Sequence, residues 1–275
     1  MKIDLLFITY NRLPYTKLAV PSILADPTEE FSLTIWDNGS TDGTREYLST
    51  VEDPRIIRKE FAKENVRLHG AVNDVVSRSS ADLFGIIFDD FIVNAGWTRP
   101  LAQAHADVPE FGLIGCWYFS PEEFDYERAK HKIQKFGRHQ VLRHPWTGVG
   151  AGLVKVKTMR EFGPLESSRT TPYWVRMASK GYVNGHYYPL IYAEHMDYPW
   201  SPHFAFSNRL EDWLKISSGA KHHGIHSLED AKAWHQVVLR NILDEPWEAK
   251  YYVGWRGKLR RVKERTRKFL QKSAF

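Results

Sequence analysis

Three groups of polar residues follow short apolar runs within the first 90 residues of this 275-residue chain. They are Thr9-Tyr10-Asn11-Arg12, Asp37-Asn38 and Asp89-Asp90. Apolar runs of this length, bounded by turn-forming residues, are typical of buried parallel strands. Open α/β sheets bind their ligands at the carboxyl ends of such strands. We therefore expect the three groups to meet at one edge of a sheet and to form a nucleotide site with a metal ion beside it.

Asp89 and Asp90 give the sharper signal for a metal ion. Two adjacent carboxylates at the end of a buried strand repel each other and lose hydration, which is costly unless a cation compensates. A few hard oxygen ligands suit Mg²⁺ or Mn²⁺ that is already bridged to a diphosphate. The alternative is a structural pair of carboxylates that caps a neighbouring helix.

The two earlier groups offer the chemistry of nucleotide recognition. Residues 9–12 combine a hydroxyl, an aromatic ring, an amide and a cation, which together suit a base and its phosphates. The Asp37 carboxylate can accept hydrogen bonds from the imide N–H of uracil or from ribose hydroxyls. Each group also has a structural alternative, because Asn and Asp commonly form turns without any ligand.

The elements that must position these groups alternate between strands and helices. This alternation is typical of a parallel sheet with helices on both faces. The polar, mixed-charge segment 120–144 is expected to be a surface excursion, and the patterns from residue 204 onward are helical. Strands are predicted over 3–8, 33–36, 56–57, 83–88, 111–118, 148–154 and 187–193, and helices over 15–24, 43–51, 66–79 and 172–180.

Composition indicates a soluble globular protein, with 43% apolar and 26% charged residues. The single cysteine, Cys116, excludes an intramolecular disulfide. No apolar run approaches the roughly 18 residues needed to span a bilayer, and the N-terminus lacks the pattern of a signal peptide. We therefore expect a cytoplasmic protein. The aromatic share of 14% suits contact with sugar rings, although aromatic side chains more often belong to the core.

The spacing of these motifs resembles that of the family 2 glycosyltransferases, which have the fold known as GT-A. The resemblance covers roughly residues 1 to 200. Its most specific part is Asp37-Asn38-Gly39-Ser40-Thr41-Asp42-Gly43-Thr44, and Phe88-Asp89-Asp90 is similar to the family's DXD metal motif. Residues 65–73 match its Asn-rich helix, except that Arg67 stands where a glycine is usual, and residues 148–154 resemble its glycine-rich acceptor-side strand.

The resemblance implies an α/β fold with one Rossmann-like mixed sheet flanked by helices. It implies a GT-A domain over 1–203, with a nucleotide-binding half over about 1–100 and an acceptor-binding half over about 101–203. Residues 204–275 would be a helical extension. The implied donor site comprises Thr9, Tyr10, Asn11, Arg12, Asp37, Asn38, Asn65, Arg67 and Asp89, with Asp90 and His195 as ligands of Mn²⁺ or Mg²⁺.

One departure from the family concerns the catalytic base. Inverting members carry a Glu-Asp pair before an Arg-containing helix, but Arg169 and Thr170 occupy those positions here. Glu166 is the nearest candidate base. A retaining enzyme needs no strong base, so His195 together with the missing pair keeps retention open. A non-catalytic scaffold that binds the nucleotide sugar is a further alternative, whereas a nucleotidyltransferase is disfavoured because Asn11-Arg12-Leu13-Pro14 replaces its usual glycine-rich loop.

The partners expected are a nucleoside diphosphate sugar and a glycan or lipid-linked acceptor. UDP is the favoured nucleotide, with dTDP and GDP as alternatives. The acceptor would approach Gly150, bordered by Trp146, Tyr173 and Trp174. Residues 256–272 hold nine Lys or Arg against Glu264 alone, which predicts a basic amphipathic helix. Such a helix suits an anionic membrane surface, at the inner face of the membrane. The alternative is a solvated helix that packs on the main domain. No nucleic-acid partner is expected, because no base-reading module is present.

Overall fold

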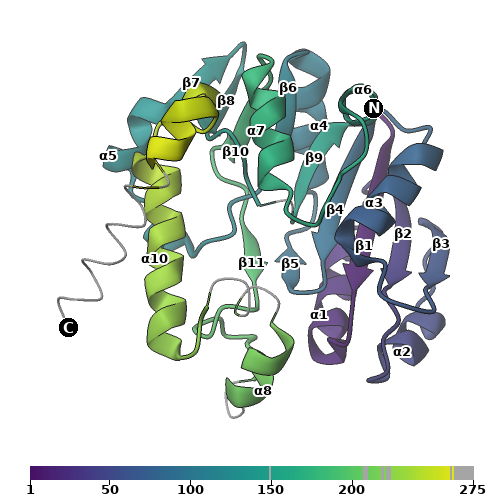
Figure 1. Cartoon of the computed structure of the whole chain (residues 1–275). Helices are drawn as coiled ribbons and strands as arrows, with labels where there is room; N and C mark the ends of the chain where they lie inside the picture. Colours follow the sequence, from purple (N-terminus) through teal and green to yellow (C-terminus); the bar gives the residue numbers. More distant parts are fainter. Residues whose placement is uncertain (149, 207–209, 218–219, 221–223, 261, 263–275) are drawn as a thin grey trace.

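The computed structural model describes residues 1–148, 150–206, 210–217, 220, 224–260 and 262. Within these residues the main sheet has nine strands in the order β3-β2-β1-β4-β9-β6-β10-β8-β7 (Figure 1). Strands β1, β2, β3 and β4 are parallel, and β9 runs antiparallel to both β4 and β6. A separate pair joins β5 to β11. The α/β class with a mixed sheet is therefore confirmed.

The strands and helices have the following bounds. The strands are β1 (Ile3–Thr9), β2 (Ser32–Asp37), β3 (Ile56–Phe61), β4 (Leu83–Phe88), β5 (Phe91–Val93), β6 (Phe111–Gly115), β7 (Ile133–Phe136), β8 (His139–Arg143), β9 (Gly152–Lys155), β10 (Val183–Tyr188) and β11 (Ala193–His195). The α-helices are α1 (Leu13–Leu24), α2 (Thr44–Thr50), α3 (Arg67–Arg78), α4 (Thr98–Asp107), α5 (Tyr126–Ala129), α6 (Val156–Phe162), α7 (Thr171–Ser179), α8 (Leu210–Ile216) and α10 (Leu228–Asp244).

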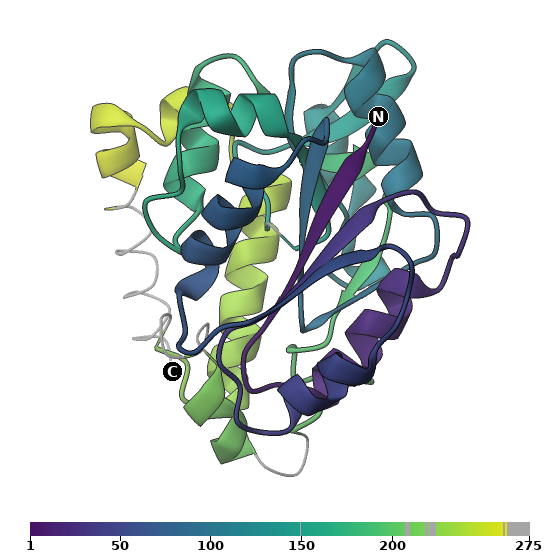
Figure 2. The same ribbon diagram turned by 90° about the vertical axis from the view of Figure 1, so that its right-hand side faces the viewer.

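Two apolar cores lie on the two faces of the sheet, because successive side chains of a strand point to opposite faces. In β1, Leu5 and Phe7 belong to one core, whereas Leu6 and Ile8 belong to the other. Helices α1 and α4 contribute to the first core, and α3, α6 and α7 contribute to the second. Figure 2 shows α1 and α3 on opposite sides of β1. The β-α-β alternation of the sequence thus produces helices on both faces.

The C-terminal helices continue the first of these cores. Trp213 of α8 and Leu239 of α10 are buried in the same cluster as β1. Helix α10 lies along the side of the molecule that also carries β11 (Figure 1). Within the described residues, no helix combines the length and the apolar character that a membrane crossing requires.

Two expectations about elements were wrong. The segment 120–144 is not only a surface excursion, since it contains the hairpin β7–β8, which forms the far edge of the main sheet. The last predicted strand, over 187–193, divides into the end of β10 and the start of β11. The intervening Pro189 explains the break, because proline has no N–H to donate to a sheet.

Candidate active site

The carboxyl ends of β1, β2 and β4 meet at one edge of the sheet. Thr9 pairs with Asp37 of β2, and Ile8 pairs with Phe88 of β4. The backbone continues this register beyond the strands, because the Asp89 N–H donates to the carbonyl of Ile8. The three polar groups that follow these strands in the sequence are therefore neighbours in space.

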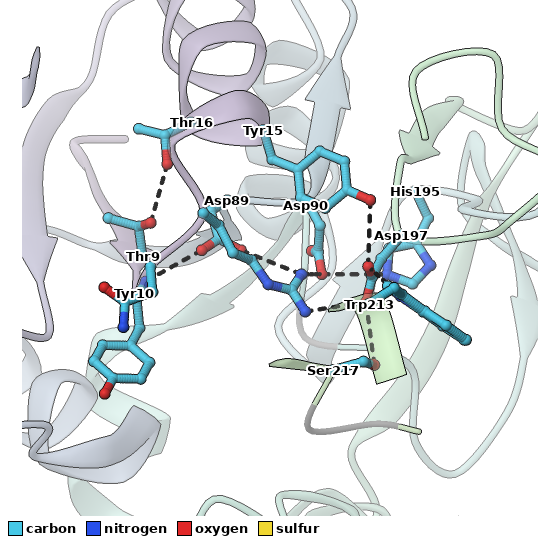
Figure 3. A network of polar contacts seen from close by, with 12 residues as sticks. Thr9, Tyr10, Tyr15, Thr16, Asp89, Asp90, His195, Asp197, Trp213 and Ser217 are labelled. Carbon is cyan, nitrogen blue, oxygen red and sulfur yellow. Dashed lines mark hydrogen bonds and ion pairs between the residues drawn. The ribbon is translucent and has the colours of Figure 1, made fainter. Parts of the chain in front are cut away.

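Arg12 holds three carboxylates together at this edge. The three carboxylates, Asp89, Asp90 and Asp197, are labelled in Figure 3. Its Nη1 lies 2.7 Å from Asp90 Oδ2 and 3.7 Å from Asp89 Oδ1, and its Nη2 lies 3.1 Å from Asp197 Oδ2. The four side chains are nearly buried, so their charges interact strongly. The positive charge that compensates the Asp89-Asp90 pair in this structure is therefore a guanidinium of the chain itself.

The two adjacent carboxylates have different environments. Burial raises the pKa of Asp89 to about 7, although Arg12 acts in the opposite direction. Burial also acts to raise the pKa of Asp90, but the nearby His195 and Arg12 outweigh it and lower the pKa to about 2. Asp90 therefore has the lower pKa of the two and stays ionised to a lower pH, which suits a metal ligand.

His195 reaches Asp90 through the small sheet. Strand β11 pairs antiparallel with β5, so that His195 lies opposite Phe91, the residue that follows Asp90. The Nε2 atom of His195 is 3.6 Å from Asp90 Oδ2, and its ring lies 4.9 Å from the ring of Phe91. The two predicted metal ligands, distant in the sequence, are thus side by side.

A divalent cation fits this pair of residues only with help from other ligands. Asp90 Oδ1 and His195 Nδ1 are buried and have no hydrogen-bond partner within the described structure. The described residues contain no group of three or more His, Cys, Asp or Glu side chains arranged around a common point for a metal. A carboxylate and an imidazole would leave the remaining coordination positions to diphosphate oxygens and water, as hard cations commonly do.

Asp197 is the main site residue that the sequence does not predict. Besides Arg12, it accepts hydrogen bonds from Trp213 Nε1 at 2.8 Å, from the Tyr15 hydroxyl at 3.4 Å and from Ser217 Oγ at 3.5 Å (Figure 3). It therefore links α1 to the C-terminal extension. The sequence gives only one indication that Asp197 belongs to the site, namely its position two residues after His195.

The predicted base-binding residues form a compact turn. Asp37 is fully buried, and its Oδ2 accepts from Arg45 Nε at 3.1 Å. Asn11 Oδ1 accepts from the Thr41 N–H at 2.7 Å, which fastens the end of β1 to this turn. Contact between Asp37 and a nucleotide base stays a prediction. Asn38, whose Oδ1 accepts from Trp36 Nε1, is buried in the same turn, whereas Tyr10 is exposed.

Arg67 begins α3 in an unusual backbone conformation. Its φ is +65°, in the left-handed region that favours glycine. Asn65 Oδ1 accepts a hydrogen bond from the Arg67 N–H at 2.8 Å and supports this bend. The geometry explains why a glycine is usual here in the family that the sequence resembles. Both side chains are exposed at the edge of the sheet that carries the site.

Glu166 lies in the loop between α6 and α7. Asn73 of α3 fixes this loop by two hydrogen bonds to the backbone of Leu165, of 2.8 and 2.9 Å. The Glu166 side chain is 86% exposed, and its Oε1 is 3.8 Å from Arg176 Nη1. The described contacts thus connect Glu166 to α7 rather than to the Arg12 cluster, and its role as base stays a prediction.

The expected acceptor-side residues divide into three environments. Trp146 lines a cavity of about 760 Å³ that also touches His195 and Asp197. Gly150 packs behind the site, where an added Cβ would lie only 2.7 Å from the Phe91 ring. Tyr173 and Trp174 are buried in the second core, which departs from the expectation that they border an acceptor. Helix α7 turns a different face toward the cavity, that of Pro172, Val175 and Arg176.

The chain is similar in sequence to a curated glucosyltransferase. The chain is 24% identical over 146 residues to a validoxylamine A glucosyltransferase of Streptomyces hygroscopicus subsp. jinggangensis (strain 5008). That match covers 50% of this chain and 35% of the relative, so the chain spans about a third of the length of this curated protein.

Two solved structures share the fold. The mannosyltransferase PcManGT from Pyrobaculum calidifontis, in complex with GDP-Man and Mn²⁺, aligns with a TM-score of 0.56 at 15% identity, over 87% of this chain and 80% of that one. TarS 1-349 of S. aureus aligns with a TM-score of 0.51 at 15% identity, over 88% of this chain and 73% of that one.

The family assignment follows from a match to more than half of the chain. The model of glycosyl transferase family 2 matches residues 4–166, which include β1 to β4, the Arg12 group, Asp89 and Asp90. The chain belongs to glycosyl transferase family 2.

Proposed function

We propose that this protein transfers a sugar from a nucleoside diphosphate sugar to a hydroxyl group of an acceptor. The observation that carries the proposal is the meeting of three strand ends around Asp90, whose Oδ1 is buried without a hydrogen-bond partner beside His195. Such strand ends are the usual ligand site of open α/β sheets. Membership of the family supports the same reaction class.

Asp90 and His195 would hold a divalent cation, Mn²⁺ or Mg²⁺. When bound, such an ion offsets the negative charge that develops on the departing diphosphate. Arg12 supplies a fixed positive charge at the same place, and its three carboxylate partners orient the guanidinium. Support for the metal comes from the orphaned carboxylate oxygen and from the Mn²⁺ named with the mannosyltransferase of the same fold.

The nucleoside would lie over the turn formed by Asn11, Asp37 and Asn38. UDP remains the favoured nucleotide, with dTDP and GDP as alternatives. GDP must be included in any test, because the mannosyltransferase PcManGT, which shares the fold, was solved in complex with GDP-Man. Tyr10 is exposed at this edge and offers a ring on which a base can stack. The proposed donor site also includes Asn65, just before α3, and Arg67, its first residue. Thr9 and Asp89, at the ends of β1 and β4, belong to the same proposed site.

The favoured stereochemical course is inversion, with Glu166 taking the proton of the acceptor hydroxyl. The two hydrogen bonds between the Asn73 side chain and the Leu165 backbone support Glu166 as the base, because they fix the loop that carries it. A retaining course remains the second candidate, favoured by the position of His195 beside Asp90 and by the exposure of Glu166. In a scaffold without catalysis, the donor would bind but no sugar would be transferred.

Residues 256–272 are proposed to contact an anionic membrane surface. Most of this segment lies outside the described residues. Its described start carries exposed Leu259 beside Arg256 and Lys258, and exposed Trp255 directly precedes it. Apolar side chains next to cations are typical of helices at lipid headgroups.

Calorimetric titration with UDP, dTDP and GDP, each with and without Mn²⁺, tests the donor proposal. We expect one nucleotide to bind, and to bind more tightly when Mn²⁺ is present. The matching sugar nucleotides would then be tested for turnover. Absence of binding for all three nucleotides, under both conditions, would contradict the proposal and leave only the fold.

A further inference from the structure

The cavity beside the site is lined by residues of α7 and α10 and by the segments around β11 and α8. Helix α10 lines it with Ala231, Trp234, Val238 and Asn241, whose spacing of three and four residues places them on one helical face. Helix α7 lines it with a face that includes Val175. Residues of α10 therefore line one side of the cavity, and residues of α7 line another.

The cavity is continuous with the proposed reaction centre. His195 and Asp197 both line it, and these same residues contact Asp90 and Arg12. A molecule that fills the cavity can therefore present one end to the donor sugar. The volume of about 760 Å³ is typical of sites for small organic ligands.

The lining favours an apolar occupant over a sugar. Besides four tryptophan rings, which also suit a sugar, it includes the aliphatic side chains of Val175, Ile225, Ala231, Val238 and Val253. Its charged groups already have partners: Arg176 donates to the carbonyl of Phe162, and Arg260 Nε lies 3.4 Å from Glu245. A glycan has hydroxyl groups around its whole edge, and each one buried without a partner is unfavourable.

An apolar surface leads from the cavity to the outside. Val253 lines the cavity and is itself 43% exposed, and the nearby Trp255 is 69% exposed. A chain too long for the cavity can leave it over these side chains. The same stretch begins the basic segment 256–272.

We propose that this cavity binds the apolar body of a lipid-linked acceptor, with the acceptor hydroxyl toward His195 and Asp197. This inference rests on the proposed sugar transfer and names the class of its acceptor. It also gives the C-terminal extension a direct part in acceptor binding.

Farnesol, a short isoprenoid alcohol, is a suitable probe, and maltotriose is the glycan comparison. Binding would be followed by quenching of tryptophan fluorescence and by calorimetry. We expect farnesol to bind and maltotriose not to bind. Ala231→Leu, which adds three carbon atoms to the α10 side of the cavity, should weaken farnesol binding about tenfold, because these atoms take space that the ligand would occupy.

Ala233→Leu is the matched control, since Ala233 lies on the exposed face of the same helix. It should bind farnesol as the unmodified protein does. If Ala231→Leu fails to fold, as judged by circular dichroism, Val238→Trp fills the same cavity from the next turns of α10. Equal farnesol affinity in the cavity-filled and control variants would overturn the inference, and so would maltotriose binding that Ala231→Leu weakens.

The nucleotide titration separates this inference from the proposed function. Nucleotide binding without farnesol binding would overturn the lipid acceptor and leave sugar transfer standing. Farnesol binding without any nucleotide binding would overturn both the proposed function and the assignment of the cavity to an acceptor.

Discussion

The guanidinium of Arg12 donates to the carboxylate of Asp90 over 2.7 Å and so ties the end of β1 to the end of β4. It also pairs with Asp89 and Asp197. One guanidinium and three carboxyl groups are thereby packed into a nearly buried group, in which the pKa of Asp89 is raised and that of Asp90 is lowered. Removing the guanidinium leaves these carboxyl groups without its compensating charge, so we expect Arg12 to contribute to both stability and function.

Arg12→Met should lower the free energy of unfolding by about 3–5 kcal/mol, the usual effect of breaking a buried ion pair from one side. Chemical denaturation measures this loss. Arg99→Met is the control, because Arg99 pairs with Asp26 at the surface and should contribute less than about 1 kcal/mol. We also expect Mn²⁺ to restore part of the stability of Arg12→Met. No loss of stability in this variant would contradict the role given to Arg12.

Asp90→Asn should abolish the strengthening of nucleotide binding by Mn²⁺, because the amide lacks the charge of the carboxylate that holds the ion. Calorimetry with and without Mn²⁺ measures the effect. Asp82→Asn is the matched control, since Asp82 precedes β4 at the opposite end from Asp89 and Asp90. An unchanged response to Mn²⁺ in Asp90→Asn would remove Asp90 from the metal site.

Glu166→Gln should reduce turnover by at least about 100-fold while donor affinity stays the same, the scale expected on losing a general base. The paired measurement is the initial rate of transfer and the calorimetric affinity for the nucleotide. Glu161→Gln, an exposed carboxylate at the end of α6, should leave both unchanged. Normal turnover in Glu166→Gln would favour a retaining course, in which no strong base is needed.

Two buried histidines should make stability fall in acid. Burial lowers the pKa of His105 to about 3 and that of His186 to about 4, against about 6.5 in an unfolded chain. Between pH 6.5 and pH 4 the unfolded chain therefore binds protons that the native protein does not. Stability rises with pH in this window and is lost as the pH falls.

His105→Gln tests this acid sensitivity. The glutamine amide can still donate to the carbonyl of Leu153, which His105 Nε2 contacts at 3.0 Å. The free energy of unfolding should then depend less steeply on pH, by up to about 1.4 kcal/mol per pH unit. The exposed His131→Gln should keep the original slope. An unaltered slope in His105→Gln would show that His105 already titrates normally in the native protein.

Deletion of residues 263–275 should reduce binding to vesicles that contain anionic lipids, because it removes most of the cations of the basic segment. Co-sedimentation with anionic and with neutral vesicles measures the difference. Nucleotide affinity serves as the internal control and should not change. Equal binding to anionic vesicles before and after the deletion would argue against the membrane contact.

The sequence predicts the parallel half of the fold well, because β1, β2 and β4 are apolar runs that end in recognisable turn residues. It fails for β7 and β8, whose interspersed polar and cationic residues conceal a strand pair at the edge of the sheet, where one row of side chains faces solvent. The placement of Asp89-Asp90 and of His195 follows from strand ends and from one short antiparallel pair.

The finer structure of the site could not be predicted in the same way. Arg12 and Asp197 are separated by 185 positions, and no local pattern links them. The burial of Tyr173 and Trp174 depends on which face of α7 meets the sheet, and aromatic residues occur on both kinds of face. The positive φ of Arg67 is visible only in the backbone itself.

The position of Asp197 has a consequence for the order in which the nascent chain matures. Ribosomes deliver Arg12 185 positions before Asp197, and Trp213, which fixes Asp197 by its indole N–H, arrives later still. The amino-terminal part of a protein commonly folds first during synthesis. The donor edge of the sheet is therefore completed only when the extension has been translated and docked, so that a prematurely terminated chain is left without a finished site.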